Sequence, residues 1–246
     1  MRLLNLCAAF AGLLTLWVAA SPAVAQVSIG KNTFKYSGRS YFRGKSENVN
    51  LASYGEKKAP VGQANYLAVE DDIDRNTVKH VTVKISGPYD ISWSSFKEGD
   101  VNAGISYLKT AGGTGSFSWS AAKTANLKLV KFSIDEGPLK TLLNSHASGA
   151  RNHLKSEGAD GRIVSEVWVV MEGTLASRVK NCGSFDGAAS SNGLKVKINT
   201  SACAGASATV SIPTNTTFAY MMHKVKSWNG DKSRIEDLED DNSGLN

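Results

Sequence analysis

The sequence has few of the residues that build catalytic and metal sites. It contains three cysteines and four histidines in 246 residues, and it has no Gly-x-Ser-x-Gly and no His-Glu-x-x-His motif. The glycines at 112–115 are not followed by the Lys-Ser/Thr pair of a phosphate loop. A carboxylate pair for sugar hydrolysis stays open, because such pairs are distant in sequence. The sequence therefore predicts a protein that is not an enzyme and binds no cofactor.

Metal ligands at suitable spacings are also lacking. The acidic cluster at 70–74 has neither the glycine nor the final glutamate of a calcium-binding loop. His146 and His153 share a face of an expected helix, but no third ligand accompanies them. We predict packing or surface roles for both histidines and no metal site.

Only one long apolar run occurs, and it lies at the start of the chain. Arg2 precedes weakly polar residues 3–20, and Ala23-Val24-Ala25 follows with small residues at both ends. This order is typical of a signal peptide, and the apolar core is short for a membrane span. We expect cleavage near Ala25 and a secreted or periplasmic protein with no retained anchor.

Removing residues 1–25 leaves two cysteines, Cys182 and Cys203. An even pair in an exported protein indicates a disulfide, which would stabilise the fold by about 3 kcal/mol. A reactive thiol or half of a metal site is the alternative, but no histidine or CxxC motif lies nearby in the sequence.

Charge is distributed unevenly along the chain. Residues 229–246 carry six acidic and two basic side chains, whereas the whole chain has a net charge of +6. Residues 26–228 are therefore strongly basic, which suggests an anionic external partner or an acidic segment folded back over the basic surface. Composition alone favours a flexible, solubilising tail at 229–246.

The most basic stretch interleaves cations with aromatic rings. Residues 31–45 contain five basic and four aromatic side chains, interrupted by Gly38 and Gly44. Such a mixture suits lipid headgroups or polyanionic sugars, and we expect no nucleic-acid partner. Ordinary edge strands with solvated cations are an equal alternative. The candidate contacts with an anionic surface are Lys31, Lys35, Arg39, Arg43 and Lys45.

Apolar patterning predicts an α+β fold with a twisted, mostly antiparallel sheet, one principal helix and shorter ones, in a single domain at 26–228. Residues 163–171 form the strongest strand, and Val167, Val169 and Met171 share an apolar face that is either core or a latent lipid surface. The principal helix is expected over 138–155, ending before Gly158. Further strands are expected over 78–85, 116–120, 127–134, 174–180, 194–198, 208–211 and 217–228.

The order of these elements over residues 138–228 resembles the second half of the gasdermin pore-forming domain. The similarity rests on the helix, the run Val167-Trp168-Val169-Val170-Met171-Glu172, a glycine-rich loop, and the stretch from Val210 through Ile212-Pro213 to Tyr220. Met171 stands where gasdermins have threonine.

The resemblance implies a protein that binds acidic lipid membranes, forms homo-oligomers there and inserts β-hairpins as a pore. Residues 163–180 and 194–212 would form one hairpin, and 78–134 would supply the other. The alternative function is a non-catalytic binding module, secreted or periplasmic, for a protein or an anionic glycan.

Overall fold

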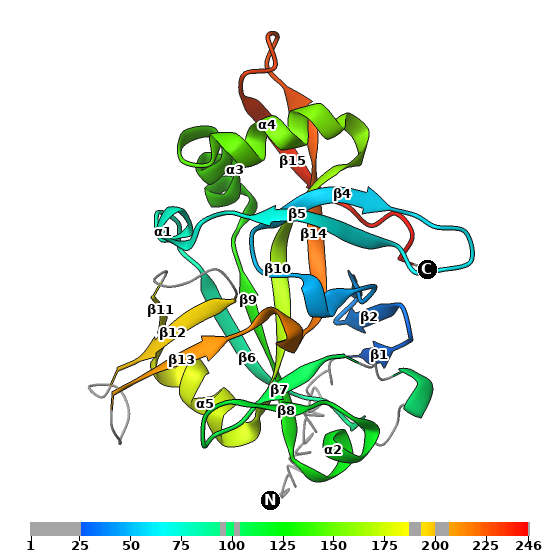
Figure 1. The fold of residues 1–246 in the computed structure, drawn as a ribbon, viewed down its shortest axis with the longest axis vertical. Coiled ribbons are helices and arrows are strands. Elements are labelled where there is room, and N and C mark those ends of the chain that lie inside the picture. Colours follow the sequence, from blue (N-terminus) through cyan, green and yellow to red (C-terminus); the bar gives the residue numbers. More distant parts are fainter. Residues whose placement is uncertain (1–25, 94–96, 101–103, 187–192, 200–206, 246) are drawn as a thin grey trace, which may run out of the picture.

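One long strand organises the fold (Figure 1). The computed structural model describes residues 26–93, 97–100, 104–186, 193–199 and 207–245. Strand β10 (Gly161–Glu172) has 11 of its 12 residues buried. It pairs antiparallel with β14 (Thr217–Trp228) on one side, and with β4 (Ser53–Lys58) and β9 (Leu127–Ser133) on the other. The prediction of a strand over residues 163–171 is confirmed, and the strand lies in the interior of the sheet.

The main sheet is mostly antiparallel, with the path β1-β2-β3-β14-β10-β4-β5, and the α+β prediction is confirmed. Its other strands are β1 (Val27–Ile29), β2 (Thr33–Tyr36), β3 (Arg39–Phe42), β5 (Tyr66–Asp72), β6 (Lys84–Asp90), β7 (Ser106–Leu108), β8 (Thr114–Ser116) and β15 (Ile235–Asp240). A separate sheet has the order β11 (Gly183–Phe185), β12 (Leu194–Ile198) and β13 (Ala208–Ile212).

The expected helix at 138–155 is two helices. Helix α3 (Glu136–Ser145) ends where the N–H of His146 bonds to the carbonyl of Leu142, and α4 (Ser148–Glu157) begins after Ala147. The break lets α3 pack on β15 while α4 packs on β10 and β4. Gly149 therefore lies in the first turn of α4, where it costs less than in the middle of one long helix. Gly158, with a φ of 55°, ends α4 as predicted.

The expected strand at 174–180 is helix α5 (Gly173–Cys182). Its buried residues Leu175, Ala176 and Val179 follow helical spacing, so one face of the helix is covered. Residues 163–180 consequently form a strand followed by a helix, and the first limb of the expected hairpin extends only to Glu172.

Two other strand predictions are wrong in their bounds. Residues 75–78 form α1 (Arg75–Val78), and β6 runs from Lys84 through Gly87-Pro88, where its register against β9 shifts. The segment 116–120 ends β8 and begins α2 (Trp119–Thr124), because the hydroxyl of Ser118 caps that helix by accepting the N–H of Ala121. Short 3₁₀ turns complete the fold at Ser46–Asn48, Glu98–Asp100, Gly158–Asp160 and Thr214–Thr216. In the part of the chain that the structure describes, no helix is long and apolar enough to cross a membrane.

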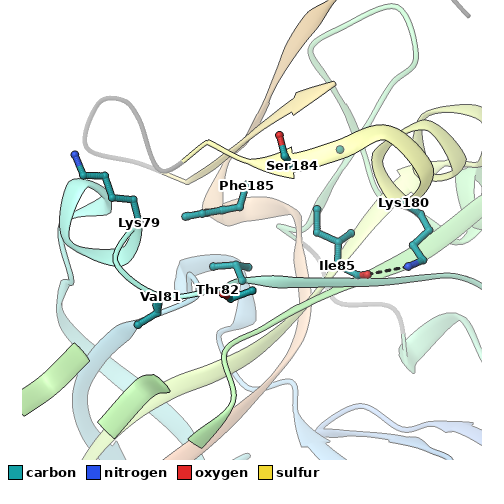
Figure 2. Close-up of a pocket in the computed structure, with 9 residues that line it drawn as sticks. Lys79, Val81, Thr82, Ile85, Lys180, Ser184 and Phe185 are labelled. Carbon is teal, nitrogen blue, oxygen red and sulfur yellow. Dashed lines mark hydrogen bonds between the residues drawn. The ribbon is translucent and has the colours of Figure 1, made fainter. Parts of the chain in front are cut away.

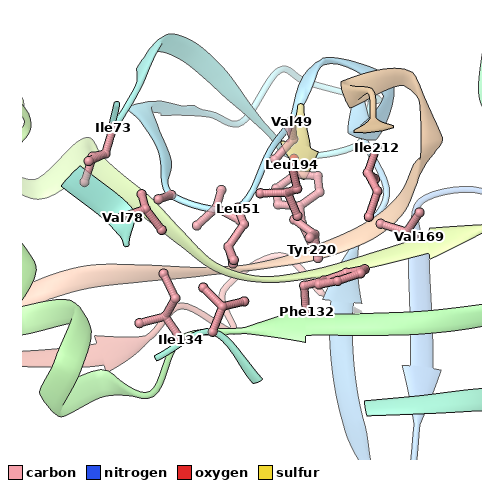
Figure 3. Packing of buried hydrophobic residues seen from close by; sticks show 14 of the residues in the cluster. Val49, Leu51, Ile73, Val78, Phe132, Ile134, Val169, Leu194, Ile212 and Tyr220 are labelled. Atoms are coloured by element: carbon pink, nitrogen blue, oxygen red, sulfur yellow. The ribbon is translucent and has the colours of Figure 1, made fainter. Parts of the chain in front are cut away.

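Both faces of β10 are covered, so the interior has two hydrophobic clusters. The larger cluster includes Val167, Val169 and Met171, each at most 1% exposed, and so the structure places this apolar face in the core. Figure 3 shows Val169 in that cluster with Phe132 and Tyr220. The second cluster is aromatic and gathers around Trp168. We infer that β10 holds the two layers together.

The acidic C-terminal segment is part of the fold and not a flexible tail. Strand β15 pairs antiparallel with β14, and its residues Ile235 and Leu238 are buried. Cross-strand ion pairs join Lys224 to Glu239 at 2.9 Å and Lys226 to Asp237 at 3.0 Å. The prediction of a flexible tail was wrong, because the acidic side chains of β15 pair with basic side chains of the neighbouring strand β14.

Asp241 anchors this segment inside the protein. Its Oδ2 accepts hydrogen bonds from Lys57 Nζ at 2.5 Å and from Arg162 Nε at 2.8 Å. The side chains of Asp241, Lys57 and Arg162 are at most 7% exposed. Burial alone would raise the pKa of Asp241, but the hydrogen bonds from Lys57, Ser243 and Arg162 outweigh it and hold the pKa far below its usual range.

We expect Asp241→Asn to lower the free energy of unfolding by about 3–5 kcal/mol, because Lys57 and Arg162 would be left as unpaired buried cations. A carboxylate whose pKa is lowered on folding stabilises above its unfolded pKa, and this stabilisation is lost as the pH falls below about 5. The variant should therefore show a smaller loss of stability between pH 5 and 3 than the native chain. Urea unfolding across that range is the measurement.

Glu239→Gln is the control, since it removes an exposed pair of small energetic value. A native-like urea midpoint for Asp241→Asn would contradict the anchoring role.

Candidate functional site

The basic N-terminal segment does not form one continuous binding surface. Lys31 and Lys35 are exposed, and Lys45 places its ammonium 4.0 Å from the ring centre of Tyr66. Arg39, in β3, donates hydrogen bonds to Glu166 and Asp240, both at 2.8 Å. The three rings Phe34, Tyr41 and Phe42 are buried in the core. The expectation of short strands is confirmed, but most of the aromatic surface faces inward.

Arg43 is not a surface residue and cannot contact a membrane or glycan from its native position. Its side chain is fully buried, its Nη1 donates to the carbonyl of Gly30, and its guanidinium lies 4.3 Å from the ring centre of Phe218. The sequence could not show this, because an alternating basic pattern does not tell which cation turns inward. The prediction of Arg43 as an anionic-surface contact was wrong.

A polar cluster joins β3, β10 and β15. One carboxylate oxygen of Glu166 accepts the hydrogen bond from Arg39, and the other accepts one from Lys131 Nζ at 3.2 Å. His223 Nε2 lies 3.2 Å from Asp240 Oδ1. Burial lowers the pKa of His223, although Asp240 acts in the opposite direction. The Arg39 guanidinium fills the space between the two carboxylates, where a glycosidase would hold its sugar. These ion pairs tie the neighbouring strands together.

The strongest candidate for a binding site is the small sheet β11–β13 with helix α5. Residues Leu194, Val196 and Ile198 of β12 are buried, and Figure 3 shows Leu194 and Ile212 in the main core cluster. The opposite face of the sheet is hydrophilic, with Lys195 and Lys197 paired across from Ser211 and Thr209. The sheet is thus fixed by its apolar face and presents cations and hydroxyls on the other face.

A cavity of about 380 Å³ lies along the outer edge of β11, between that strand and the segment leading into β6. Lysines stand at its two ends, hydroxyl groups line it, and one aromatic ring enters it. Figure 2 shows Phe185 between β11 and the segment carrying Val81 and Thr82, with Lys180 reaching across. Lys180 Nζ donates to the carbonyl of Ile85 at 3.2 Å. The lining residues used below are Lys79, Thr82, Lys180, Ser184 and Phe185.

The backbone of β11 also faces this cavity. Asp186 N bonds to the carbonyl of Lys195, and Asn199 N bonds to the carbonyl of Cys182, so alternate residues of β11 point their amides and carbonyls toward β12. The antiparallel ladder then turns the N–H and C=O of Phe185 outward. The cavity therefore offers a donor and an acceptor beside a half-buried ring.

Charge at this end of the molecule is positive. Within the described parts of 173–199, Arg178, Lys180, Lys195 and Lys197 are basic, and Asp186 is the one acidic residue. Of these basic residues Lys180 lines the cavity, together with Lys79, and the two ammonium groups favour an anionic ligand there. Sequence reasoning missed this site. The available signal was Lys180 closely followed by Gly183-Ser184-Phe185 in a region almost free of acid.

One cysteine of the predicted disulfide lies in the described part of the chain. Cys182 is buried at the end of α5, and Cys203 lies outside the described residues, as do residues 1–25, the predicted signal peptide. The Cys182–Cys203 disulfide and cleavage near Ala25 both stay predictions.

The histidines do not assemble a metal centre. His146 stacks on His80 with ring centres 4.4 Å apart, whereas His153, on α4, contacts Tyr54 of β4. Among the residues described, no group of three or more histidine, cysteine, aspartate or glutamate side chains is arranged to hold a metal ion.

Comparison with known proteins adds no relative: no family model, curated protein or solved structure matches this chain.

Proposed function

We propose that this chain is an exported, non-catalytic binding module that takes an anionic saccharide in the β11 cavity. The observation that carries the proposal is the combination of lysines at both ends of the cavity with a half-buried aromatic ring between them. Lysine ammonium groups attract a carboxylate or sulfate, and an aromatic ring offers an apolar face to a sugar ring.

The cavity volume supports a ligand of one or two sugar rings. About 380 Å³ lies near the lower end of the range for small-molecule sites. Thr82, Ser184 and the outward backbone of Phe185 supply hydroxyl, donor and acceptor groups for sugar hydroxyls. Lys180 would exchange its bond with the Ile85 carbonyl for a bond with the charged group of the ligand.

The test compares a galacturonate trisaccharide with a neutral galactose trisaccharide by titration calorimetry. We expect the acidic sugar to bind more tightly, and Lys180→Glu to weaken its binding at least tenfold. Phe185→Ala should weaken both sugars, because it removes the shared apolar contact. Raising the salt concentration should weaken only the acidic sugar, since the exposed charges are screened.

Lys232→Glu is the matched control, because Lys232 is an exposed lysine in the turn before β15, far from this cavity in the fold (Figure 1). Equal affinity for the two sugars, or an equal effect of Lys180→Glu and Lys232→Glu, would sink the proposal.

The same basic end favours a second proposal, the membrane-active function that the gasdermin resemblance implies. Lys195 and Lys197 on the outer face of the small sheet could receive acidic headgroups and seed a homo-oligomer on the membrane. Insertion would require α5 to become a strand and Val167, Val169 and Met171 to leave the core. Dye leakage from liposomes of acidic phospholipid, measured with the full mature chain, tests this proposal. Intact liposomes at saturating protein would reject it.

A further inference from the structure

A second cavity lies along the opposite edge of the small sheet. It has a volume of about 570 Å³ and runs between β13, the β7–β8 loop at 109–113, and Leu175 and Arg178 of α5. Leu175 and Ile198 give it an apolar floor, and Lys109 and Arg178 stand at its sides. This cavity shares no lining residue with the β11 cavity.

The backbone of β13 is directed into this cavity. The backbone groups of Lys195 and Asn199 form hydrogen bonds with β11. The backbone groups of the alternate residues Leu194, Val196 and Ile198 therefore point toward β13 and form hydrogen bonds with it. Their partners are Ile212, Val210 and Ala208. The N–H and C=O groups of the intervening residues, Thr209 and Ser211, therefore point away from β12. Both residues line the cavity.

Strand β13 lacks the features that normally block an exposed edge. Its five residues, Ala-Thr-Val-Ser-Ile, include no charge and no proline, and Pro213 follows only after the strand has ended. Four of them line the cavity, so a segment of about four residues could lie beside them at the usual strand spacing. Main-chain hydrogen bonds between that segment and β13 would supply affinity. Every second side chain of the segment would pack on the apolar floor of the cavity.

Charge decides which extended segment fits. Lys195 and Lys197 project from the face beside β13, and Lys109 and Arg178 flank the cavity. Glu172 lies near the loop, where its Oε2 accepts the N–H of Thr110 at 2.6 Å. A second copy of this chain would bring the same cations against these, which disfavours pairing between two β13 strands. An acidic partner meets no such repulsion.

We propose that β13 binds an extended acidic segment of another protein by adding it as a fourth strand to the small sheet. Apolar side chains of that segment face Leu175 and Ile198, and its carboxylates face the lysines of β12. The proposal is independent of the saccharide site, because it uses the other edge of the sheet.

The probe is a fluorescein-labelled eight-residue peptide that alternates valine and glutamate, measured by fluorescence anisotropy. Saturable binding is expected, and a valine–lysine peptide should not bind. Two further peptides are N-methylated at alternate residues, one at the valines and one at the glutamates. Only one edge of the peptide pairs with β13, so one of these peptides should lose binding and the other should keep it. Equal binding of both N-methylated peptides, or no binding of the parent peptide up to about 1 mM, would overturn the proposal.

Protein variants locate the contact. Thr209→Pro removes an outward N–H that β12 does not use, and we expect it to weaken peptide binding at least tenfold. Thr209→Val keeps that N–H and is the matched control. If Thr209→Pro folds and binds the peptide like Thr209→Val, β13 is not the docking strand. If it does not fold, the N-methylated peptides on the native chain decide the question.

Discussion

A chain cut after residue 228 should fail to fold. The cut removes β15 and the buried side chains Ile235, Leu238 and Leu245, each of which stabilises by about 1.5–3 kcal/mol. It also removes Asp241 and leaves Lys57 and Arg162 as buried cations without their carboxylate, at a further cost of about 3–5 kcal/mol. These losses are comparable with the whole stability of a domain, about 5–15 kcal/mol.

The measurement is thermal unfolding followed by circular dichroism, comparing residues 26–228 with residues 26–246. We expect a cooperative transition only for the longer chain. Both chains lack residues 1–25, so any effect of removing that segment is common to them. A shorter chain that unfolds cooperatively at a similar Tm would show that the C-terminal segment is dispensable.

Replacing Trp168 by alanine should be the most damaging single change in the aromatic cluster. The indole is 1% exposed. Four rings surround it, with centres 5.0–5.2 Å from its own, and these belong to Phe34, Tyr36, Tyr41 and Tyr89. Losing this packing should cost about 3–5 kcal/mol. The expected fall in Tm is about 10 °C or more for a domain of this size.

Trp119→Ala is the control for the loss of an indole, because Trp119 is only half-buried at the start of α2. The Tm of Trp168→Phe should lie between those of Trp168→Ala and Trp119→Ala, since phenylalanine keeps a ring in the cluster. If Trp168→Ala and Trp119→Ala have the same Tm, β10 does not hold the two layers together through this residue.

The strands with strong local signals were predictable from the sequence. β10 and β14 are long runs of apolar and β-branched residues, and β12 alternates lysine with Leu194, Val196 and Ile198. Such patterns identify an element whatever surrounds it, because burying one or both apolar faces is the main driving force for folding. The fold class followed from these elements.

The prediction failed where the local pattern was short or where the partner was distant. Leu175, Ala176 and Val179 fit a helical face, but a segment of only seven residues with three apolar side chains can also be read as a strand. The break at His146–Ala147 depends on the separate surfaces that α3 and α4 cover. The acidic segment pairs with Lys224 and Lys226 through geometry that composition cannot show.

The candidate site was not predictable because its parts come from three distant segments. Lys79 follows α1, Lys180 lies in the last turn of α5, and Phe185 is the last residue of β11. No local motif joins them, whereas the basic aromatic stretch at 31–45 is conspicuous in sequence yet mostly engaged in core packing and ion pairs. A local density of cations and rings identifies candidates, but burial decides which of them reach a ligand.

Nuclear magnetic resonance titration of residues 26–246 with the galacturonate trisaccharide tests the central proposal most directly. Because the cavity is bounded by residues 79–85, 180 and 183–185, we predict that the largest amide shift changes fall on these residues. Thr209 and Ser211, on the far edge of the same sheet, should change little. The absence of saturable shifts, or shifts centred on another surface, would contradict the assignment of this cavity as a saccharide site.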